Sequence, residues 1–594
     1  MAAPSSDSTV IFLDWSGWIL GQGSVQAGQS IRRASRAVVA DLCRLAGRWC
    51  KPFSVVRLAP DLRKAGRGGH FLGYARELCG DWLPVSIPEI ADRRPFLGTF
   101  SAEPVGPDDG VAGYAGSLVG DLRRVGMGLF FYPRGGSARV AGYLSRALQA
   151  HGWSVALACG SLGGPGALSN AESVFAGVDI VPARYDDAVA RWTRGEDPMD
   201  APFPMHPSFE ARWGVPDRAF PWVSPAQGQR MALAWAALLA ESDAMLRARV
   251  LHLHHLTPIH EAAALALPGV PVVTHLHGTE LKMLAAVARC EPTIDGPHAE
   301  WWASGMRDSA RRAAATITIS PHDQSEAVRL LGIDPETVYS IPNGVDIDRF
   351  IRYRPSLQER RSHWLRWLVG DPRGWDEATS TPGSVRYTEG EVSEAFFDAE
   401  TGEARPVLMY VGRFLGFKRV PLLVRAYARA RARMSVPAPL VIWGGWPGEW
   451  EGEHPHTVVM RERIEGVFFD GWRDHDELPL GLSCADCFVA PSTDEPFGLV
   501  YLEAMACELP VIGTLSGGPP SFINVTAGEP DGWLVPPDDE AALAAAMVTA
   551  VEDEGQRTRR RVNAYRHARE NYSWHNVAGQ VIDVYERHAP PDGP

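Results

Sequence analysis

The chain has 594 residues, of which 45% are hydrophobic, and its formal net charge at pH 7 is −13. A chain of this length exceeds what one hydrophobic core can hold, so two or three folded domains are expected. The acidic balance argues against nucleic acid as the main partner, although local basic loops can still bind phosphates.

Cysteine usage and targeting signals indicate the compartment. The sequence shows no apolar run long enough for a membrane span and no basic-then-apolar signal peptide, so we expect a cytoplasmic protein. The eight cysteines are irregularly spaced, which favours reduced, buried thiols over disulfides. Cys484 and Cys487 form one CxxC, but no second pair or histidines in register accompany it, so core packing is favoured over a zinc site.

Residues 1–124 have the patterns of folded sequence but carry no recognisable motif. Residues 10–20 predict a strand running into a loop, residues 31–48 have helical periodicity, and residues 53–59 predict another strand. Residues 99–124 are rich in Gly, Pro and Asp, which is typical of a linker. Two interpretations stay open: an accessory αβ segment packed on the next domain, or a recognition module.

A βαβ unit begins at Gly126. Residues 126–132 predict a buried strand, residues 133–153 a glycine loop and an amphipathic helix, and residues 154–160 the next strand. Glycines at the strand–helix turn let a ligand approach the backbone, although the G-x-G-x-x-G pattern of dinucleotide-binding folds is absent.

Two further buried strands, predicted at residues 250–256 and 270–281, end in polar residues. The first strand and the residues after it carry four histidines, His252, His254, His255 and His260. Strand alternation separates His252 and His254 from His255, so we expect no metal site there. His277, at the end of the second strand, is either a functional residue or a hydrogen-bonded structural one.

The middle of the chain contains a crossover and an insertion. Residues 301–332 predict a helix, a strand and a second helix, and residues 341–350 follow with the D-x-D formed by Asp346 and Asp348. In this loop we interpret the D-x-D as turn and capping chemistry. Residues 351–404 are polar, Trp-bearing and rich in turn dipeptides, which predicts an excursion over the surface.

The second half of the chain predicts a further series of short buried strands. They fall at residues 407–412, 440–445, 467–472, 487–492 and 510–514, and a turn and strand edge follows at 532–539. Helices from about residue 540 complete the chain.

Two carboxylates, Glu495 and Glu503, are separated by seven residues between two of these strands. Pro496 disfavours helical geometry at the residue before it and suits a first helical turn, so Glu495 is expected at the mouth of a helix and Glu503 within it. The free N–H groups and dipole of that helix favour an anionic ligand. Upstream, Arg413 and Lys418 occupy a loop after a strand, a suitable place for a diphosphate.

These segments resemble the C-terminal half of the retaining glycosyltransferases of family 4, which have the GT-B fold. The family pattern is a Glu, seven residues and a Glu, downstream of a G-R-x4-K loop; here they read E-PFGLVYL-E and G-R-FLGF-K, followed by the pair Gly517 and Gly518. The T-x-x-H-G-T-type segment in 270–281 and the P-N-G-V-D segment in 341–350 extend the resemblance over roughly residues 126–588, without the insertion.

The resemblance implies an α/β protein with two Rossmann-like domains facing across a deep cleft, plus an N-terminal αβ extension. It places the extension at residues 1–124 and the acceptor domain at 125–342. The nucleotide-sugar donor domain follows at 343–572 with its insertion at 351–404, and a helix at 573–594 crosses back to the acceptor domain.

The activity that the resemblance implies is transfer of a sugar, with retention, from a nucleotide-diphosphate sugar to a hydroxyl acceptor by front-face attack. The acceptor is a small molecule, natural product, saccharide or lipid, and a lipid would add peripheral membrane contact. Arg413 and Lys418 would neutralise the leaving diphosphate, Glu495 would orient the sugar, and Glu503 would bind the ribose. His277 would lie near the reacting sugar. No tightly bound cofactor and no catalytic metal are implied.

Further donor contacts are implied for residues around the glycine loops, the helix mouth and the third strand of the donor domain. They are Gly135, Gly136, Gly412, Phe497, Gly498, Leu499, Val467 and Gly471. Ser521 departs from the family, which usually carries a Glu at that position. Two alternatives stay open: another GT-B enzyme, such as a sugar-nucleotide epimerase or phosphorylase, and a non-catalytic sugar-nucleotide sensor or scaffold. Abundant Ala, Arg and Gly favour a bacterial source.

Overall fold

The computed structural model describes residues 123–209, 214–291, 296–526 and 528–589, and the backbone of four strands nearer the N-terminus. The chain divides into two units, Met1–Leu122 and Arg123–Pro594. In the first unit, two antiparallel pairs are formed by β1 (Asp7–Leu13) with β2 (Ile19–Gln26) and by β3 (His70–Arg76) with β4 (Trp82–Pro88). Strand β1 overlaps the strand expected from residue 10, whereas the helix expected at 31–48 and the strand at 53–59 lie outside the described residues.

The second unit begins with a sheet of seven parallel strands in the order β11-β10-β9-β8-β5-β6-β7. The strands are β5 (Arg124–Leu129), β6 (Ser154–Ser161), β7 (Asp179–Arg184), β8 (Val250–His254), β9 (Val272–His275), β10 (Ala315–Thr318) and β11 (Val338–Ser340). Strands β5, β6 and β8 are almost entirely buried, and apart from the two histidines of β8 and the ends of β5 and β6 they consist of apolar and small residues.

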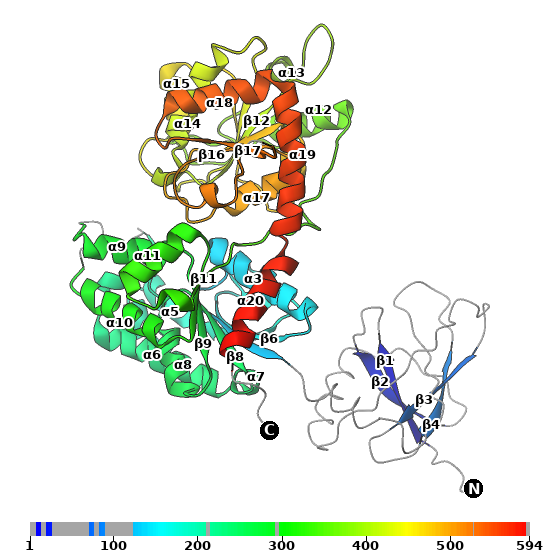
Figure 1. Ribbon diagram of the computed structural model, residues 1–594, viewed down its shortest axis with the longest axis vertical. Helices are drawn as coiled ribbons and strands as arrows, with labels where there is room; N and C mark the ends of the chain where they lie inside the picture. The colour runs from blue at the N-terminus through cyan, green and yellow to red at the C-terminus, as the bar shows by residue number, and fades with distance from the viewer. Residues whose placement is uncertain are drawn as a thin grey trace. The chain divides into compact units, whose positions relative to one another are not determined.

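Helices connect these strands and cover the sheet (Figure 1). They are α3 (Gly135–Ala150), α4 (Ala171–Val174), α5 (Asp186–Thr193), α6 (Pro225–Ala240), α7 (Asp243–Leu246), α8 (Ile259–Ala266), α9 (Thr279–Ala288), α10 (Ala299–Arg312) and α11 (Pro321–Leu331). Short 3₁₀ turns occur at Pro198–Asp200, Phe220–Trp222 and Pro335–Thr337.

A second parallel sheet has six strands in the order β14-β13-β12-β15-β16-β17. The strands are β12 (Leu408–Gly412), β13 (Leu440–Gly444), β14 (Val467–Gly471), β15 (Cys487–Val489), β16 (Val511–Thr514) and β17 (Gly532–Val535). Its helices are α14 (Val420–Arg431), α15 (Pro455–Glu462), α16 (Leu478–Ser483), α17 (Leu499–Ala506), α18 (Glu540–Glu552) and α19 (Glu554–Asn571), with 3₁₀ turns at Gly416–Lys418 and Pro519–Ser521. The predicted class, α/β with two Rossmann-like sheets, is confirmed.

The chain passes between the two sheets twice, and the two crossings lie side by side. The Val345 N–H donates to the carbonyl oxygen of Tyr572 at 2.7 Å, and Val345 forms a parallel bridge with Ser573. Helix α20 (Trp574–His588) starts at this point and packs along α3 of the first sheet (Figure 1). Its buried face includes Trp574, Val577, Val581 and Tyr585, which join the core beneath β5 and α3.

The insertion at 351–404 is largely exposed, and it packs against the second core through a few buried residues. It forms α12 (Leu357–Leu365), a π-helical turn (Arg366–Gly370) and α13 (Glu389–Phe396), and its Trp364, Trp367 and Trp375 are completely buried in the second core. The Phe469 N–H of β14 donates to the Tyr387 hydroxyl at 2.8 Å. Because β14 is an edge strand of the sheet, the insertion covers an edge that would otherwise expose unpaired backbone groups.

Truncation of a buried insertion tryptophan tests this packing. We expect Trp367→Ala to lower the free energy of unfolding by about 3–5 kcal/mol, because the side chain is fully buried and its Nε1 donates to the Glu477 carboxylate at 3.1 Å. Urea titration followed by circular dichroism measures the loss. Trp222→Ala is the matched control, since 57% of Trp222 is exposed, and it should change stability by about 0.5 kcal/mol at most. Equal effects in the two variants would contradict the packing described.

Candidate functional site

The loop after β12 carries the two basic residues expected at a diphosphate. The Tyr410 hydroxyl donates to the carbonyl oxygen of Arg413 at 2.9 Å and fixes the turn that leaves the strand. A side chain at Gly412 would place its Cβ 2.6 Å from the same hydroxyl, so the turn requires glycine there. The Thr493 N–H donates to the carbonyl oxygen of Phe417 at 2.8 Å, which ties this loop to the one that follows β15.

Lys418 and Glu495 are brought together by these two loops. The Lys418 ammonium forms an ion pair and hydrogen bond with the Glu495 carboxylate, and both side chains are mostly buried. The backbone of Glu495 is held by the glycine pair: the Gly518 N–H donates to its carbonyl oxygen at 2.7 Å, and a Cβ at Gly517 would lie 2.4 Å from that oxygen. The glycine pair after β16 therefore has a steric cause, since only glycine lets this loop approach the backbone of the Glu495 loop so closely.

Glu503 lies within α17, as expected, and pairs with a histidine that the sequence did not single out. Its Oε1 lies 3.0 Å from Nε2 of His475, which is on the loop after β14, and the carboxylate accepts this hydrogen bond. Both groups are more than four-fifths buried. The family resemblance placed donor contacts on β14, just before this loop. No residue pattern in the sequence singles out His475 itself.

The start of α17 offers backbone groups to a ligand. Gly498 precedes the helix with a φ of 95°, and no side chain caps the first turn. Phe497 is buried against Phe522, with ring centroids 5.1 Å apart, so its side chain packs in the core and does not face a ligand. Leu499 is half-buried. An anion at the start of α17 would therefore be bound by the main-chain N–H groups of this turn.

Val467 and Gly471 need to be reconsidered as donor contacts. Val467 is the first residue of β14, at the amino end, whereas Gly412 and Gly444 end their parallel strands at the opposite, carboxyl edge. A Cβ at Gly471 would lie 2.0 Å from the carbonyl oxygen of Arg373, so the insertion covers this residue. Strand direction therefore leaves Val467 at the edge away from Arg413, whereas Gly471 ends β14 at the carboxyl edge and is covered there by the insertion.

The glycine loop of the first sheet lies opposite an acidic loop of the second. Gly135 and Gly136 are exposed at the start of α3, and no atom lies within 4 Å of a Cβ built on either. Beside them, the Arg134 guanidinium lies 3.7 Å from the Glu449 carboxylate, which is also 3.7 Å from Arg413. One carboxylate thus stands between two cations from the two sheets.

The turn after β9 makes direct contact with the Glu495 loop. A Cβ at Gly278 would lie 2.9 Å from Cβ of Pro496, so the two backbones are in close contact. The Lys282 ammonium lies 4.6 Å from the centroid of the Phe417 ring. His277, next to Gly278, is buried, and its Nε2 lies 3.0 Å from Nδ1 of His254. Burial lowers the pKa of His277 well below its usual value, so the ring is neutral.

Asp323 also belongs to this region, and sequence reasoning did not single it out. It stands in the first turn of α11, where its N–H donates to the Ser320 hydroxyl at 3.1 Å, and this ordinary capping pattern hides the residue in the sequence. Its carboxyl is buried, its Oδ2 has no hydrogen-bond partner among the described residues, and that atom lies 3.4 Å from a Cβ built on Gly278. Burial raises the pKa of Asp323 to about 7.

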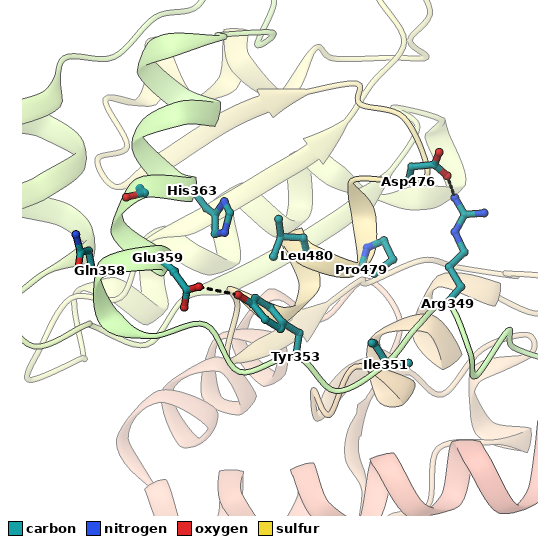
Figure 2. Close-up of a pocket in the computed structure, with 10 residues that line it drawn as sticks. Arg349, Ile351, Tyr353, Gln358, Glu359, His363, Asp476, Pro479 and Leu480 are labelled. Atoms are coloured by element: carbon teal, nitrogen blue, oxygen red, sulfur yellow. Dashed lines mark hydrogen bonds and ion pairs between the residues drawn. The ribbon is translucent and has the colours of Figure 1, made fainter. Parts of the chain in front are cut away.

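A cavity of about 750 Å³ lies elsewhere, between the segment after the first crossing, α12 and the start of α16 (Figure 2). Figure 2 shows the Tyr353 hydroxyl turned toward Glu359 and the Arg349 guanidinium turned toward Asp476. This cavity is not lined by any of the site residues that we inferred from the sequence.

Two sequence motifs have structural explanations. Asp346 Oδ1 accepts from the N–H groups of Asp348 at 3.2 Å and Arg349 at 3.1 Å, so the D-x-D makes turn hydrogen bonds as predicted. Cys484 and Cys487 are free and buried in the core, and burial raises the pKa of the Cys484 thiol to about 12. Within the described part of the chain, none of the helices is both long and apolar enough to span a membrane.

Comparison with known proteins bears on both halves of the second unit. Residues 134–349 match the family model described as Glycosyltransferase Family 4, and residues 392–567 match the one described as Glycosyl transferases group 1. The chain is 29% identical over 331 residues to D-inositol 3-phosphate glycosyltransferase 2 of Catenulispora acidiphila, covering 54% of this chain and 66% of the relative. It is 27% identical over 466 residues to the glycogen synthase of Mycobacterium tuberculosis, covering 76% and 91%.

The chain spans between 38% and 66% of the length of three D-inositol 3-phosphate glycosyltransferases that it matches. Among solved structures, the Anabaena protein Alr3699/HepE in complex with UDP matches with a TM-score of 0.52 and 17% identity, over 78% of this chain and all of that one.

Two parallel-sheet domains that contact each other through the loops at their carboxyl edges have the arrangement of the GT-B fold. The chain belongs to glycosyltransferase family 4.

Substitution of Asp323 tests its buried state. A carboxyl whose pKa is 3.8 when unfolded and about 7 when folded is protonated preferentially in the folded state, so its contribution to stability is full below pH 4 and is lost as the pH rises to 7. We expect Asp323→Asn, which cannot ionise, to gain in melting temperature over wild type as the pH rises from 5 to 8, by several degrees at pH 8. Differential scanning fluorimetry across this range measures the difference.

Asp348→Asn, which removes one exposed carboxylate, is the control for this experiment. A constant difference between Asp323→Asn and wild type from pH 5 to 8 would show that the carboxyl is ordinary.

Proposed function

We propose that this enzyme transfers a sugar, with retention of configuration, from a nucleotide-diphosphate sugar to a hydroxyl acceptor. The observation that carries the proposal is the Lys418–Glu495 pair, which stands beside Arg413 at the point where the loops of the two sheets touch. A cation and a carboxylate at this place match the two demands of the reaction, which are to stabilise a leaving diphosphate and to orient a sugar.

The diphosphate is assigned to Arg413, Lys418 and the uncapped first turn of α17. The Arg413 side chain is 56% exposed and its contact with Glu449 is long, at 3.7 Å, so a phosphate can compete for it. Positive groups aimed at charge that develops on the leaving group stabilise the transition state. Because these groups supply the charge, the proposal includes no catalytic metal and no tightly bound cofactor.

The sugar and the ribose are assigned to the two carboxylates. Glu495 is fixed by the glycine pair at its backbone and by Lys418 at its carboxylate, which suits it to accept hydrogen bonds from sugar hydroxyls. Glu503, with its Oε1 engaged by His475, retains acceptor capacity for ribose hydroxyls. Gly135 and Gly136 leave open space in which a phosphate can approach the backbone.

Retention is assigned to front-face attack. The bond between the anomeric carbon and the diphosphate oxygen breaks, the acceptor oxygen bonds to the same face of that carbon, and the departing nucleoside diphosphate takes the acceptor proton on a phosphate oxygen. A double displacement needs an ionised carboxylate as nucleophile. Asp323 lies nearby, but with a pKa of about 7 it is protonated in much of the population at neutral pH, which does not suit that role. His277, neutral and adjacent to the Gly278 contact, is assigned to the acceptor side.

Donor binding is the first test. We expect one nucleotide of a panel of UDP, GDP, ADP and TDP, each with its common sugars, to raise the melting temperature of wild type, and to fail to do so with Lys418→Ala. UDP is tried first, since the Anabaena neighbour holds it. A ligand at 100 times its Kd stabilises a protein by about 2.7 kcal/mol, which a thermal shift detects.

Arg429→Ala is the matched control for donor binding, because Arg429 lies on the exposed side of α14 and pairs with Glu540. It should keep the wild-type shift. Absence of a shift with every nucleotide, or an equal shift in Lys418→Ala, would count against the donor site.

Turnover and stereochemistry are the second test. With the donor identified, we expect Lys418→Ala and Arg413→Ala each to lower kcat by about 10²–10³-fold, the loss seen when one transition-state donor is removed. Proton NMR of the product should show the anomeric configuration of the donor. An inverted product would refute front-face attack, and wild-type rates in either variant would refute the assignment of the diphosphate.

A further inference from the structure

Three histidines form a cluster inside the first sheet, away from the residues assigned to the donor. His252 and His254 are two residues apart on β8, so they project to the same face, and His275 on β9 is the register partner of His254. One ring nitrogen from each of the three lies within 4.8 Å of the others. All three side chains are buried.

The hydrogen bonds of the cluster leave two ring nitrogens without partners. His252 Nδ1 lies 2.7 Å from the Tyr585 hydroxyl of α20, and His254 Nδ1 lies 3.0 Å from Nε2 of His277. His252 Nε2 lies 3.1 Å from Nδ1 of His275. The Nε2 atoms of His254 and His275 are buried and have no hydrogen-bond partner in the described part of the chain. Buried polar atoms are rarely left in this state, so these two require an explanation.

The outer contacts have the arrangement of a metal site. A metal-ligating histidine normally donates its second ring N–H to a fixed acceptor. When Nδ1 of His252 donates to Tyr585 and Nδ1 of His254 donates to His277, both rings carry a lone pair on Nε2.

The spacing of the nitrogens also agrees with a bound ion. Two nitrogens at about 2.0–2.1 Å from a tetrahedral ion are about 3.3 Å apart, and His252 Nε2 and His275 Nδ1 are already 3.1 Å apart. An ion that takes His275 through Nδ1 and His252 and His254 through Nε2 satisfies the orphaned His254 Nε2, and it leaves His275 Nε2 to carry the second ring proton.

We propose that His252, His254 and His275 bind one divalent transition-metal ion, with Zn²⁺ the first candidate. Imidazole ligands suit Zn²⁺, Cu²⁺ and Ni²⁺, and three protein ligands leave one tetrahedral position for water. The ion joins β8 to β9. Through Tyr585 it is coupled to α20, and through His277 to the turn at Gly278 that touches Pro496. The site is structural, and it does not depend on the proposed transfer reaction.

Cobalt titration of the full chain tests the proposal. Protein stripped with EDTA and dialysed should bind one equivalent of Co²⁺ with the visible absorption of a tetrahedral ion, and one equivalent of Zn²⁺ should remove that absorption. His254→Gln and His275→Gln should each abolish it. His260→Gln and Cys290→Ser should retain it: His260 is a buried histidine whose Nε2 bonds Thr274, and Cys290 is an exposed thiol that can bind ions adventitiously.

A second variant keeps the test decisive if the glutamine variants do not fold. Tyr585→Phe leaves all three ligands in place and removes only the hydroxyl near His252, so it should keep one equivalent of Zn²⁺ with about 10-fold weaker affinity by competition titration. The proposal is overturned if wild type shows no stoichiometric binding, if binding survives in folded His254→Gln or His275→Gln, if Cys290→Ser abolishes it, or if Tyr585→Phe leaves the Zn²⁺ affinity unchanged.

Discussion

Strand direction is the constraint on which the whole site depends. In each of the two large sheets every described strand runs parallel to its neighbours, so the loops that leave their carboxyl ends gather on one edge. The contact between Gly278 and Pro496 places one such edge against the other. Arg413 and Lys418 come from one loop of the second sheet, Glu495 from another, and His277 and Asp323 from the first sheet, yet this single geometric rule brings them to one region. The same rule removes Val467, which belongs to the opposite end of its strand.

Much of this architecture was predictable because buried parallel strands are written as uninterrupted apolar runs. Strands β5, β12 and β13 were visible in the sequence for that reason, whereas β7 contains a proline and charged ends, and β11 has only three residues. The insertion was recognised as polar and surface-lying, but composition does not show that its tryptophans are buried against the second sheet. The Glu495 and Lys418 assignments came from a motif whose spacing reflects the contact between two loops.

Other features depend on relations between segments that a sequence does not display. Alternation along β8 correctly separated His255 from His252 and His254, but the third member of the cluster, His275, comes from the neighbouring strand and becomes a neighbour only through register. Asp323 has the local pattern of a helix cap, and only tertiary packing buries its carboxyl. His475 likewise gains its meaning from Glu503, which lies 28 residues away.

The pairing of the two crossings has a mechanical consequence. Because Val345 and Ser573 are bridged, the two connections between the sheets act as one joint and not as two separate straps. A shift of one connection relative to the other would break the Val345–Tyr572 hydrogen bond. Gly344 lies against the Trp574 ring, 2.7 Å from where a Cβ would stand, so this joint has no room for a larger side chain. A substitution at Gly344 would therefore disturb both connections between the sheets at once.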